Sequence, residues 1–192
     1  MALVFIGGGA RSGKSGFAVR RALEAGPKRV FIATAQAYDE EMEARIAAHR
    51  RERSDAFETI EAPLELRAAL EAAVEKRPDA IVIDCLTLWM SNLLLDEHPT
   101  ERIIEQVDRI AAMAQAAPMP VFLVTNEVGM GIVPNAKLGR VFRDLAGSAH
   151  QQLANAANEV LFAVMGLMLR IAPGPVEVIT SGAPLAGAQH ED

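Results

Sequence analysis

The sequence predicts an α/β fold of three layers, in which helices cover both faces of a mainly parallel sheet. Five short runs are rich in Val, Ile, Leu and Phe and are continuous rather than alternating, which is typical of strands buried on both faces. These runs span residues 3–6, 30–33, 80–84, 121–125 and 160–164. Longer segments compatible with helices separate them, and alternation of strands with helices predicts right-handed crossovers between parallel strands.

The segments between the strands carry ordinary helix signals. Gly26-Pro27 ends the first of them, and Pro118 and Pro120 bracket the entry to a strand. The expected helices span residues 14–25, 39–53, 64–76, 86–95, 100–117 and 135–157. Together with the strands they predict one nucleotide-binding domain over residues 1–171.

The composition changes after this domain. From Ala172 onward the chain is rich in Pro, Gly, Ala and Ser. We therefore expect residues 172–192 to be a C-terminal extension, with a short antiparallel edge strand near 176–180 followed by a loose tail.

Charge and hydropathy exclude several classes of protein. The formal net charge of −6 gives no basic field that would attract nucleic acid or an anionic membrane. No apolar stretch approaches the roughly 20 residues that a membrane-spanning helix needs. The single cysteine, Cys85, lies in an apolar run and predicts a buried, unreactive thiol. A cytoplasmic enzyme or binding protein is the expectation that remains.

A phosphate-binding loop is the strongest motif. Residues 8–15 read Gly-Gly-Ala-Arg-Ser-Gly-Lys-Ser, which satisfies the P-loop spacing between an expected strand and an expected helix. Its glycines let backbone N–H groups point at phosphate oxygens, and the helix that follows adds the positive end of its dipole. Lys14 is placed to bridge the terminal phosphates and the Ser15 hydroxyl to ligate Mg²⁺. A chance glycine-rich turn is the alternative.

Acidic residues follow two of the expected strands. Asp84 ends an apolar run, where an ionised carboxylate is costly unless it is paired or lies near a cation. It is a candidate ligand of Mg²⁺, directly or through water, although it would also suit the N-cap of the next helix. Asn126 and Glu127 follow another strand, at the edge where open α/β sheets bind ligands. A polar turn explains that pair equally well.

The expected helix at 39–53 contains a histidine, His49, and ends in arginines. Acidic residues in its first turn and basic ones in its last complement the helix dipole, so the arginines have a structural explanation. A lone helical histidine is usually structural or solvated. However, a neutral imidazole can attack phosphorus, and neighbouring arginines would neutralise the charge that builds up there. The spacing alone does not distinguish a kinase from a nucleotidyltransferase.

Several motifs together resemble the bifunctional adenosylcobinamide kinase / adenosylcobinamide-phosphate guanylyltransferase family of cobalamin biosynthesis. The resemblance runs from about residue 3 to residue 171. The D-E-x-M…R-I…H stretch and the T-N-E-V-G-x-G-I-V-P stretch are far more restrictive than the P-loop, which many families share. The matching segments are residues 8–15, 31–36, 39–50, 125–134 and 142–147.

The resemblance implies a RecA-like P-loop fold, a homotrimer and two reactions with small-molecule substrates. In the first, ATP or GTP phosphorylates the hydroxyl group of adenosylcobinamide. In the second, GTP guanylylates His49, and the GMP passes to the new phosphate to give adenosylcobinamide-GDP. His49 and Lys14 are then the catalytic residues. The implied nucleotide contacts are Gly8, Gly9, Ala10, Arg11, Ser12, Gly13, Lys14, Ser15, Ala33, Thr34, Ala35, Arg50, Arg51, Glu52, Arg53, Glu61 and Asp84.

Some alternatives stay open from the sequence. Asp84 departs from the family pattern, because a relative carries the longer Glu at this position, which changes the reach to metal or ribose. A kinase with a single function, a guanylyltransferase that has lost the kinase activity, and a nucleotide-dependent switch protein would all use the same P-loop. No aromatic stripe marks a corrinoid-binding surface.

Overall fold

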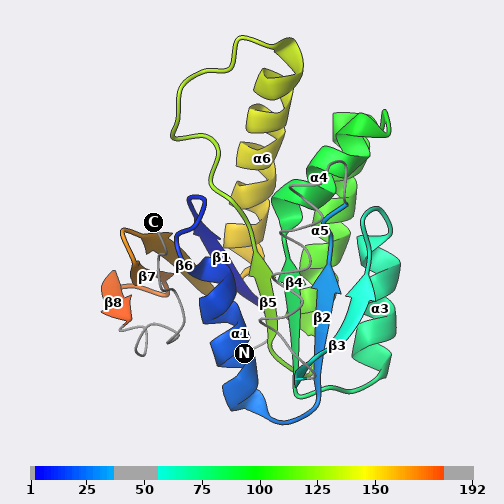
Figure 1. The fold of residues 1–192 in the computed structure, drawn as a ribbon, viewed down its shortest axis with the longest axis vertical. Coiled ribbons are helices and arrows are strands. Elements are labelled where there is room, and N and C mark those ends of the chain that lie inside the picture. Colours follow the sequence, from blue (N-terminus) through cyan, green and yellow to red (C-terminus); the bar gives the residue numbers. More distant parts are fainter. Residues whose placement is uncertain (1–2, 37–55, 180–192) are drawn as a thin grey trace, which may run out of the picture.

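The computed structural model describes residues 3–36 and 56–179 of the chain. Within this part, eight strands form one sheet in the order β3-β2-β4-β5-β1-β6-β7-β8 (Figure 1). The strands are β1 (Leu3–Gly8), β2 (Arg29–Ala33), β3 (Glu58–Glu61), β4 (Ala80–Asp84), β5 (Val121–Val124), β6 (Glu159–Val164), β7 (Leu167–Ala172) and β8 (Glu177–Ile179).

The pairing is parallel from β3 to β6 and antiparallel at the β7–β8 edge. This confirms the predicted mainly parallel sheet with its short antiparallel edge. Parallel neighbours also mean that β1, β2, β4 and β5 all end at the same edge of the sheet, which is where the P-loop begins.

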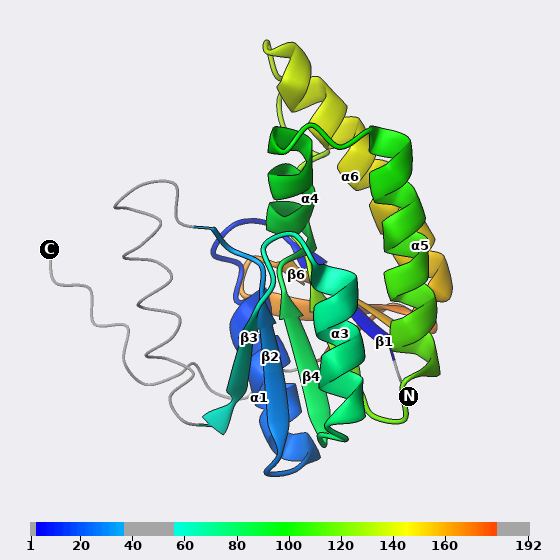
Figure 2. The ribbon, with the colours of Figure 1, turned by 90° about the vertical axis from the view of Figure 1, so that its right-hand side faces the viewer.

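Helices cover both faces of the sheet. Helix α1 packs on one face against β1, β4 and β5, while the other described helices lie on the opposite face (Figures 1 and 2). The described helices are α1 (Lys14–Ala25), α3 (Leu66–Glu75), α4 (Leu86–Leu95), α5 (Thr100–Ala116) and α6 (Lys137–Ala156). The predicted three-layer α/β fold is therefore confirmed.

Strand side chains alternate between two apolar clusters, one on each face. On β4, Ile81 and Ile83 belong to the larger cluster with α3 to α6, whereas Ala80 and Val82 face α1. Because both faces are buried, the central strands need apolar residues at every position, which explains their continuous apolar runs. None of the helices in the described ranges is long and apolar enough to cross a membrane.

The strands β3 and β7 were not predicted from the sequence. The β3 segment reads Glu-Thr-Ile-Glu and is mostly exposed, because it pairs on one side only, with β2. It therefore lacks the apolar run by which the other strands were identified. The β7 strand follows β6 through Met165 and Gly166, both with positive φ (50° and 78°). A two-residue hairpin turn at these positions is the feature of the sequence from which β7 could have been predicted. The predicted helix at 39–53 lies outside the described residues.

Candidate active site

Strand register brings the predicted site residues to one edge of the sheet. Ala33 pairs with Glu61 on one side and with Asp84 on the other. Asp84 in turn is level with Val124, and Val124 with Ile6, two residues before Gly8. Neighbouring strands lie about 4.8 Å apart, so this row spans roughly 19 Å. That width suits an extended ligand such as a nucleoside triphosphate.

The P-loop connects the end of β1 to the start of α1. Gly8 has a φ of 151°, and a Cβ there would lie 2.6 Å from the carbonyl oxygen of Ala163. Gly13, the N-cap of α1, is left-handed with a φ of 88° and carries no side-chain cap. Both positions require glycine for these reasons. The uncapped first turn of α1 leaves backbone N–H groups for an anion.

Two polar side chains lie inside this loop. Lys14 is buried, and its Nζ donates a hydrogen bond to the carbonyl oxygen of Gly9 (2.9 Å), which places the ammonium group over the loop. The Ser12 hydroxyl is buried and has no hydrogen-bond partner among the described residues. A buried hydroxyl without a partner is costly. A phosphate oxygen held in the loop would satisfy it. Ser15 is half-buried in the first turn of α1.

Thr34 fixes the backbone on both sides of the Asp84–Cys85 bond. Its fully buried hydroxyl donates to the carbonyl oxygen of Cys85 (2.7 Å) and accepts from the Cys85 N–H (2.8 Å). The Thr34 N–H donates to the carbonyl oxygen of Asp84 (3.2 Å). In addition, the side-chain amide of Asn92 donates to the Thr34 carbonyl oxygen (2.9 Å). These bonds hold the Asp84 backbone firmly at the edge.

The side chain of Asp84 does not cap the helix that follows. Cys85 is the N-cap residue of α4, and this helix has no side-chain cap hydrogen bond. The capping explanation for Asp84 is therefore wrong. The half-exposed carboxylate remains as an oxygen donor beside the strand ends.

The interior beneath Asp84 is polar but not nucleophilic. Burial, and then the charge of Asp84, raise the pKa of the Cys85 thiol to about 11, so the thiol is protonated at neutral pH. The Cys85 Sγ lies 3.2 Å from the hydroxyl of Thr87, which accepts hydrogen bonds from the backbone and side-chain N–H groups of Asn126 (3.2 and 3.3 Å). The predicted buried thiol is confirmed, and Asn126 is tied to the first turn of α4 rather than placed in a free turn.

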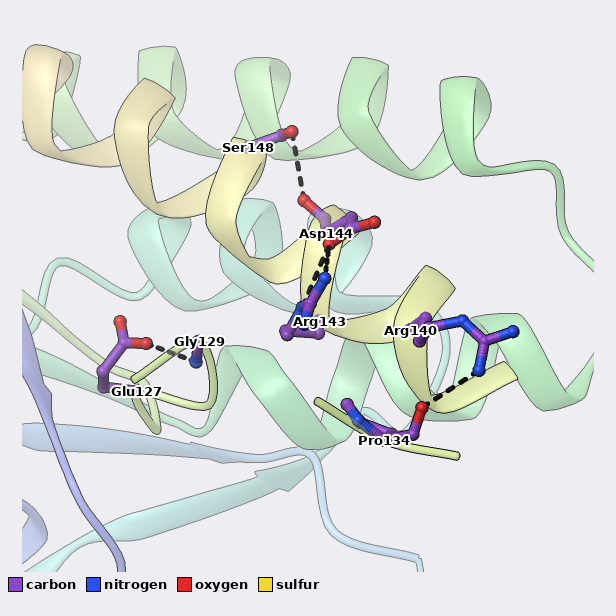
Figure 3. A network of polar contacts seen from close by, with 7 residues as sticks. All are labelled: Glu127, Gly129, Pro134, Arg140, Arg143, Asp144 and Ser148. Carbon is purple, nitrogen blue, oxygen red and sulfur yellow. Dashed lines mark hydrogen bonds and ion pairs between the residues drawn. The ribbon is translucent and has the colours of Figure 1, made fainter. Parts of the chain in front are cut away.

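Glu127 is joined to the P-loop and to a histidine that the sequence analysis missed. Its N–H donates to the carbonyl oxygen of Gly8 (2.9 Å). Its carboxylate accepts from the Gly129 N–H (Figure 3), and its Oε2 lies 3.5 Å from Nδ1 of His150. The His150 Nε2 lies 2.8 Å from the Thr125 hydroxyl. A polar turn alone does not account for this set of contacts.

The signal for His150 was its place on an apolar helix face. It lies one turn after Ala146 and one turn before Leu153, which are both buried residues of α6. Burial lowers the pKa of His150, and the nearby Glu127 opposes this shift only in part. The imidazole is then neutral at pH 7. Because a carboxylate can only accept, we infer that Nδ1 carries the proton and that Nε2 accepts from the Thr125 hydroxyl.

Part of the predicted site lies outside the described residues. This concerns the proposed nucleophile His49 and the predicted nucleotide contacts Arg50, Arg51, Glu52 and Arg53. In residues 3–36 and 56–179, no group of three or more His, Cys, Asp or Glu side chains could hold a metal ion. The P-loop, residues 33–35, Glu61 and Asp84 do meet at one edge.

Comparisons with known proteins agree with this site. A family model described as "Cobinamide kinase / cobinamide phosphate guanyltransferase" matches residues 4–171. The bifunctional adenosylcobalamin biosynthesis protein CobP of Pseudomonas aeruginosa is 42% identical over 88% of this chain and 96% of its own length. The bifunctional adenosylcobalamin biosynthesis proteins CobU of Escherichia coli and Salmonella typhimurium are each 40% identical over 88% of this chain and 99% of their own.

Removing the Thr34 hydroxyl should destabilise the protein. Thr34→Val keeps the shape but leaves the N–H and C=O of Cys85 buried without that partner, at about 1–3 kcal/mol each. We therefore expect the free energy of unfolding, measured with urea, to fall by about 2–6 kcal/mol. Thr34→Ser retains the hydroxyl and is the matched control. Equal midpoints for the two variants would contradict the role assigned to the hydroxyl.

The lowered pKa of His150 should make stability depend on pH. The unfolded chain binds a proton near pH 6.5, while the folded chain binds it only at lower pH. The contribution is thus complete above about pH 6.5 and is lost as the pH falls towards the folded pKa. Urea unfolding at a series of pH values should show this decline, and His150→Gln should reduce it. Gln151→Ala, which changes an exposed and uncharged neighbour of His150 on α6, is the control and should leave the decline unchanged.

Proposed function

The chain belongs to the cobinamide kinase / cobinamide phosphate guanyltransferase family, and we propose that it carries out both reactions at one nucleotide site built on its P-loop. It is an enzyme of cobalamin biosynthesis. The observation that carries the proposal of a shared site is the strand register, which brings the P-loop, residues 33–35, Glu61 and Asp84 to one edge. A single triphosphate along this edge presents its terminal phosphorus to one reaction and its α-phosphorus to the other.

In the kinase reaction, the P-loop holds the triphosphate of ATP or GTP. The N–H groups of residues 8–15 and the Ser12 hydroxyl donate to phosphate oxygens, and Lys14 neutralises charge on the terminal phosphates. The hydroxyl oxygen of adenosylcobinamide attacks the terminal phosphorus. Because Lys14 is already held over the loop through the Gly9 carbonyl oxygen, little of its side-chain freedom is lost on binding.

Ser15 and Asp84 are the residues that would hold Mg²⁺, directly or through water. Their oxygen donors fit this ion, which takes few protein ligands and keeps phosphate oxygens and waters for the remainder. When bound, Mg²⁺ would neutralise charge that develops between the terminal phosphates. Asp84 suits this role because its carboxylate is half-exposed and its backbone is fixed by Thr34.

In the guanylyltransferase reaction, His49 attacks the α-phosphorus of GTP and releases pyrophosphate, and GMP then passes to the corrinoid phosphate. The proposal for His49 rests on its position in the family motif at residues 39–50. Arg50, Arg51, Glu52 and Arg53 follow it directly and would contact the same nucleotide. Residues 33–35 and Glu61 lie on the side of the site away from the P-loop, where the remainder of the nucleotide would extend.

A homotrimer is proposed from the family resemblance. Support comes from exposed apolar side chains between β5 and the first turn of α6, a segment that extends away from the sheet in Figure 1. Isolated exposed apolar residues are ordinary, but a cluster on one segment is typical of a contact surface. These residues are Met130 (82% exposed), Ile132 (96%), Val133 (56%) and Leu138 (52%).

Two further proposals concern the chain as a whole. Residues 1–171 are the catalytic domain, in agreement with the family match over 4–171, and residues 172–192 are an extension that contributes β8 to the sheet edge. The enzyme works in the cytoplasm, where its nucleoside triphosphate substrates are made.

Replacing the proposed nucleophile should abolish the covalent intermediate. His49→Ala removes the only nitrogen to which GMP would be attached, so incubation with α-labelled GTP should leave no acid-labile label on the protein. Phosphorylation of cobinamide should continue. His98→Ala, which removes a histidine elsewhere in the chain, should be labelled like the wild type. Label that persists on His49→Ala would exclude His49.

Removing the P-loop lysine should impair both reactions. Lys14→Ala takes away a fixed positive charge at the phosphates, and we expect the kinase rate and the rate of GMP labelling each to fall by about 100-fold or more. Lys76→Ala, which removes an exposed lysine paired with Glu58 at the opposite edge of the sheet, is the control. A guanylyltransfer rate that is unchanged in Lys14→Ala would show that the reactions do not share one phosphate cradle.

A further inference from the structure

Glu127 is a carboxylate at the site edge without a role in the mechanism above. It follows β5, the strand that lies between the P-loop strand β1 and the Asp84 strand β4. Its N–H donates to the Gly8 carbonyl oxygen at 2.9 Å, so its backbone is in contact with the first residue of the phosphate cradle. Glu61 and Asp84, the other two carboxylates of this row, have nucleotide or metal contacts to make.

The Glu127 carboxylate is fixed in place while part of it remains accessible. One oxygen accepts a hydrogen bond from the Gly129 N–H, which holds the carboxylate against its own loop (Figure 3). The other faces Nδ1 of His150 at 3.5 Å, and the side chain keeps 24% of its surface exposed. Each carboxylate oxygen has two acceptor positions, so both retain capacity for another proton donor.

His150 fixes this geometry from the other side. It is held between the Thr125 hydroxyl and Glu127, and its ring packs against Phe5 of β1 with centroids 5.8 Å apart. Thr125 and Glu127 also donate backbone hydrogen bonds to Ile6 and Gly8 of the P-loop strand (both 2.9 Å). One imidazole therefore connects α6 to the segment directly after β5, which borders the phosphate site.

We propose that Glu127 is the general base of the kinase reaction and that His150 is a positioning residue for its carboxylate, an inference that rests on the proposed function. The hydroxyl oxygen of the acceptor forms a bond to the terminal phosphorus, and its proton moves to Glu127. The bond between that phosphorus and the bridging oxygen breaks, and the nucleoside diphosphate leaves with the electron pair.

The guanylyltransferase reaction places no such demand on Glu127. The attacking nitrogen of a neutral histidine uses a lone pair and carries no proton, and the final acceptor is a phosphate that is already ionised at neutral pH. Only the first of the two reactions begins with a protonated hydroxyl. Glu127 should consequently serve one reaction and not the other, which makes the proposal testable within a single enzyme.

The test is Glu127→Gln in the full-length protein, which keeps the size of the side chain and removes its basicity. Three rates are measured: phosphorylation of cobinamide, labelling of the protein by α-labelled GTP, and transfer of GMP to supplied cobinamide phosphate. We expect the kinase kcat to fall by about 100-fold or more with little change in KM. The other two rates should stay within about 2-fold of the wild type, since neither removes a proton from a hydroxyl.

Three results would overturn the proposal. A kinase kcat close to that of the wild type shows that Glu127 is not the base. An equal loss of all three rates, with the urea midpoint unchanged, shows that Glu127 only shapes the cradle. If Glu127→Gln lowers the urea midpoint, Glu127→Asp is measured as well, because it retains a carboxylate base. Glu127→Asp should recover part of the kinase rate that Glu127→Gln loses, and a kinase rate no higher than that of Glu127→Gln contradicts the assignment. By contrast, a wild type without kinase activity or GMP labelling refutes the proposed function itself.

His150 is tested by comparing His150→Gln with His150→Ala. Glutamine retains an N–H donor for Glu127, so it should preserve more of the kinase kcat than alanine does, while both variants keep the rate of GMP labelling. Equal kinase rates in the two variants would refute the positioning role. The control for both tests is Asp144→Asn, which should leave all three rates unchanged. Asp144 lies on α6, like His150, but its carboxylate is exposed and paired with Arg143.

Discussion

The parallel register of β2, β4, β5 and β1 is the constraint on which the site depends. It places Ala33, Asp84 and Val124 in one row beside the start of the P-loop. A slip of one residue in any of these strands would exchange the side chains between the two buried clusters, which differ in size and shape, and would disrupt the packing of both. Burial on both faces therefore specifies the register strongly, and the energy that builds the core also aligns the chemistry. The site needs no separate device to bring its strands together.

Beyond the register, buried polar side chains fix the loops that leave the sheet. Thr34 holds the backbone around Asp84, and His150 holds Thr125 and Glu127 next to the P-loop. Thr34 directly follows β2 and His150 lies on α6, and each is satisfied by neighbours far away in the sequence. Such groups make a displacement of the loops energetically costly, because a side chain that loses its partner leaves a buried polar group unpaired. That sensitivity is useful where a carboxylate must lie at a defined distance from a phosphate.

Hydrophobic pattern predicted the interior of the fold well and its edges poorly. The central strands are buried on both faces, so their apolar runs were identified to within a residue or two. The β3 strand is exposed and polar, and only pairing with β2 makes it a strand. The β7 strand was missed because its hairpin turn, at Met165 and Gly166, joins it to β6 without a change in hydropathy. Edge strands depend on partners more than on their own composition, and a pattern within one segment does not contain that information.

The sequence by itself determined the chemistry that is encoded locally: a P-loop in which Gly8 and Gly13 adopt conformations that favour glycine, the lysine and serine that follow it, and an acid at the end of an apolar strand. Each of these needs only near neighbours in the chain, so spacing is enough to identify it. Only the tertiary structure decided that Asp84 does not cap α4 and that His150 meets Glu127 and Thr125. His150 lies 25 positions after Thr125 on a different element. The meeting depends on how α6 packs against β1, α4 and α5, and that packing is a property of the assembled core rather than of any single segment.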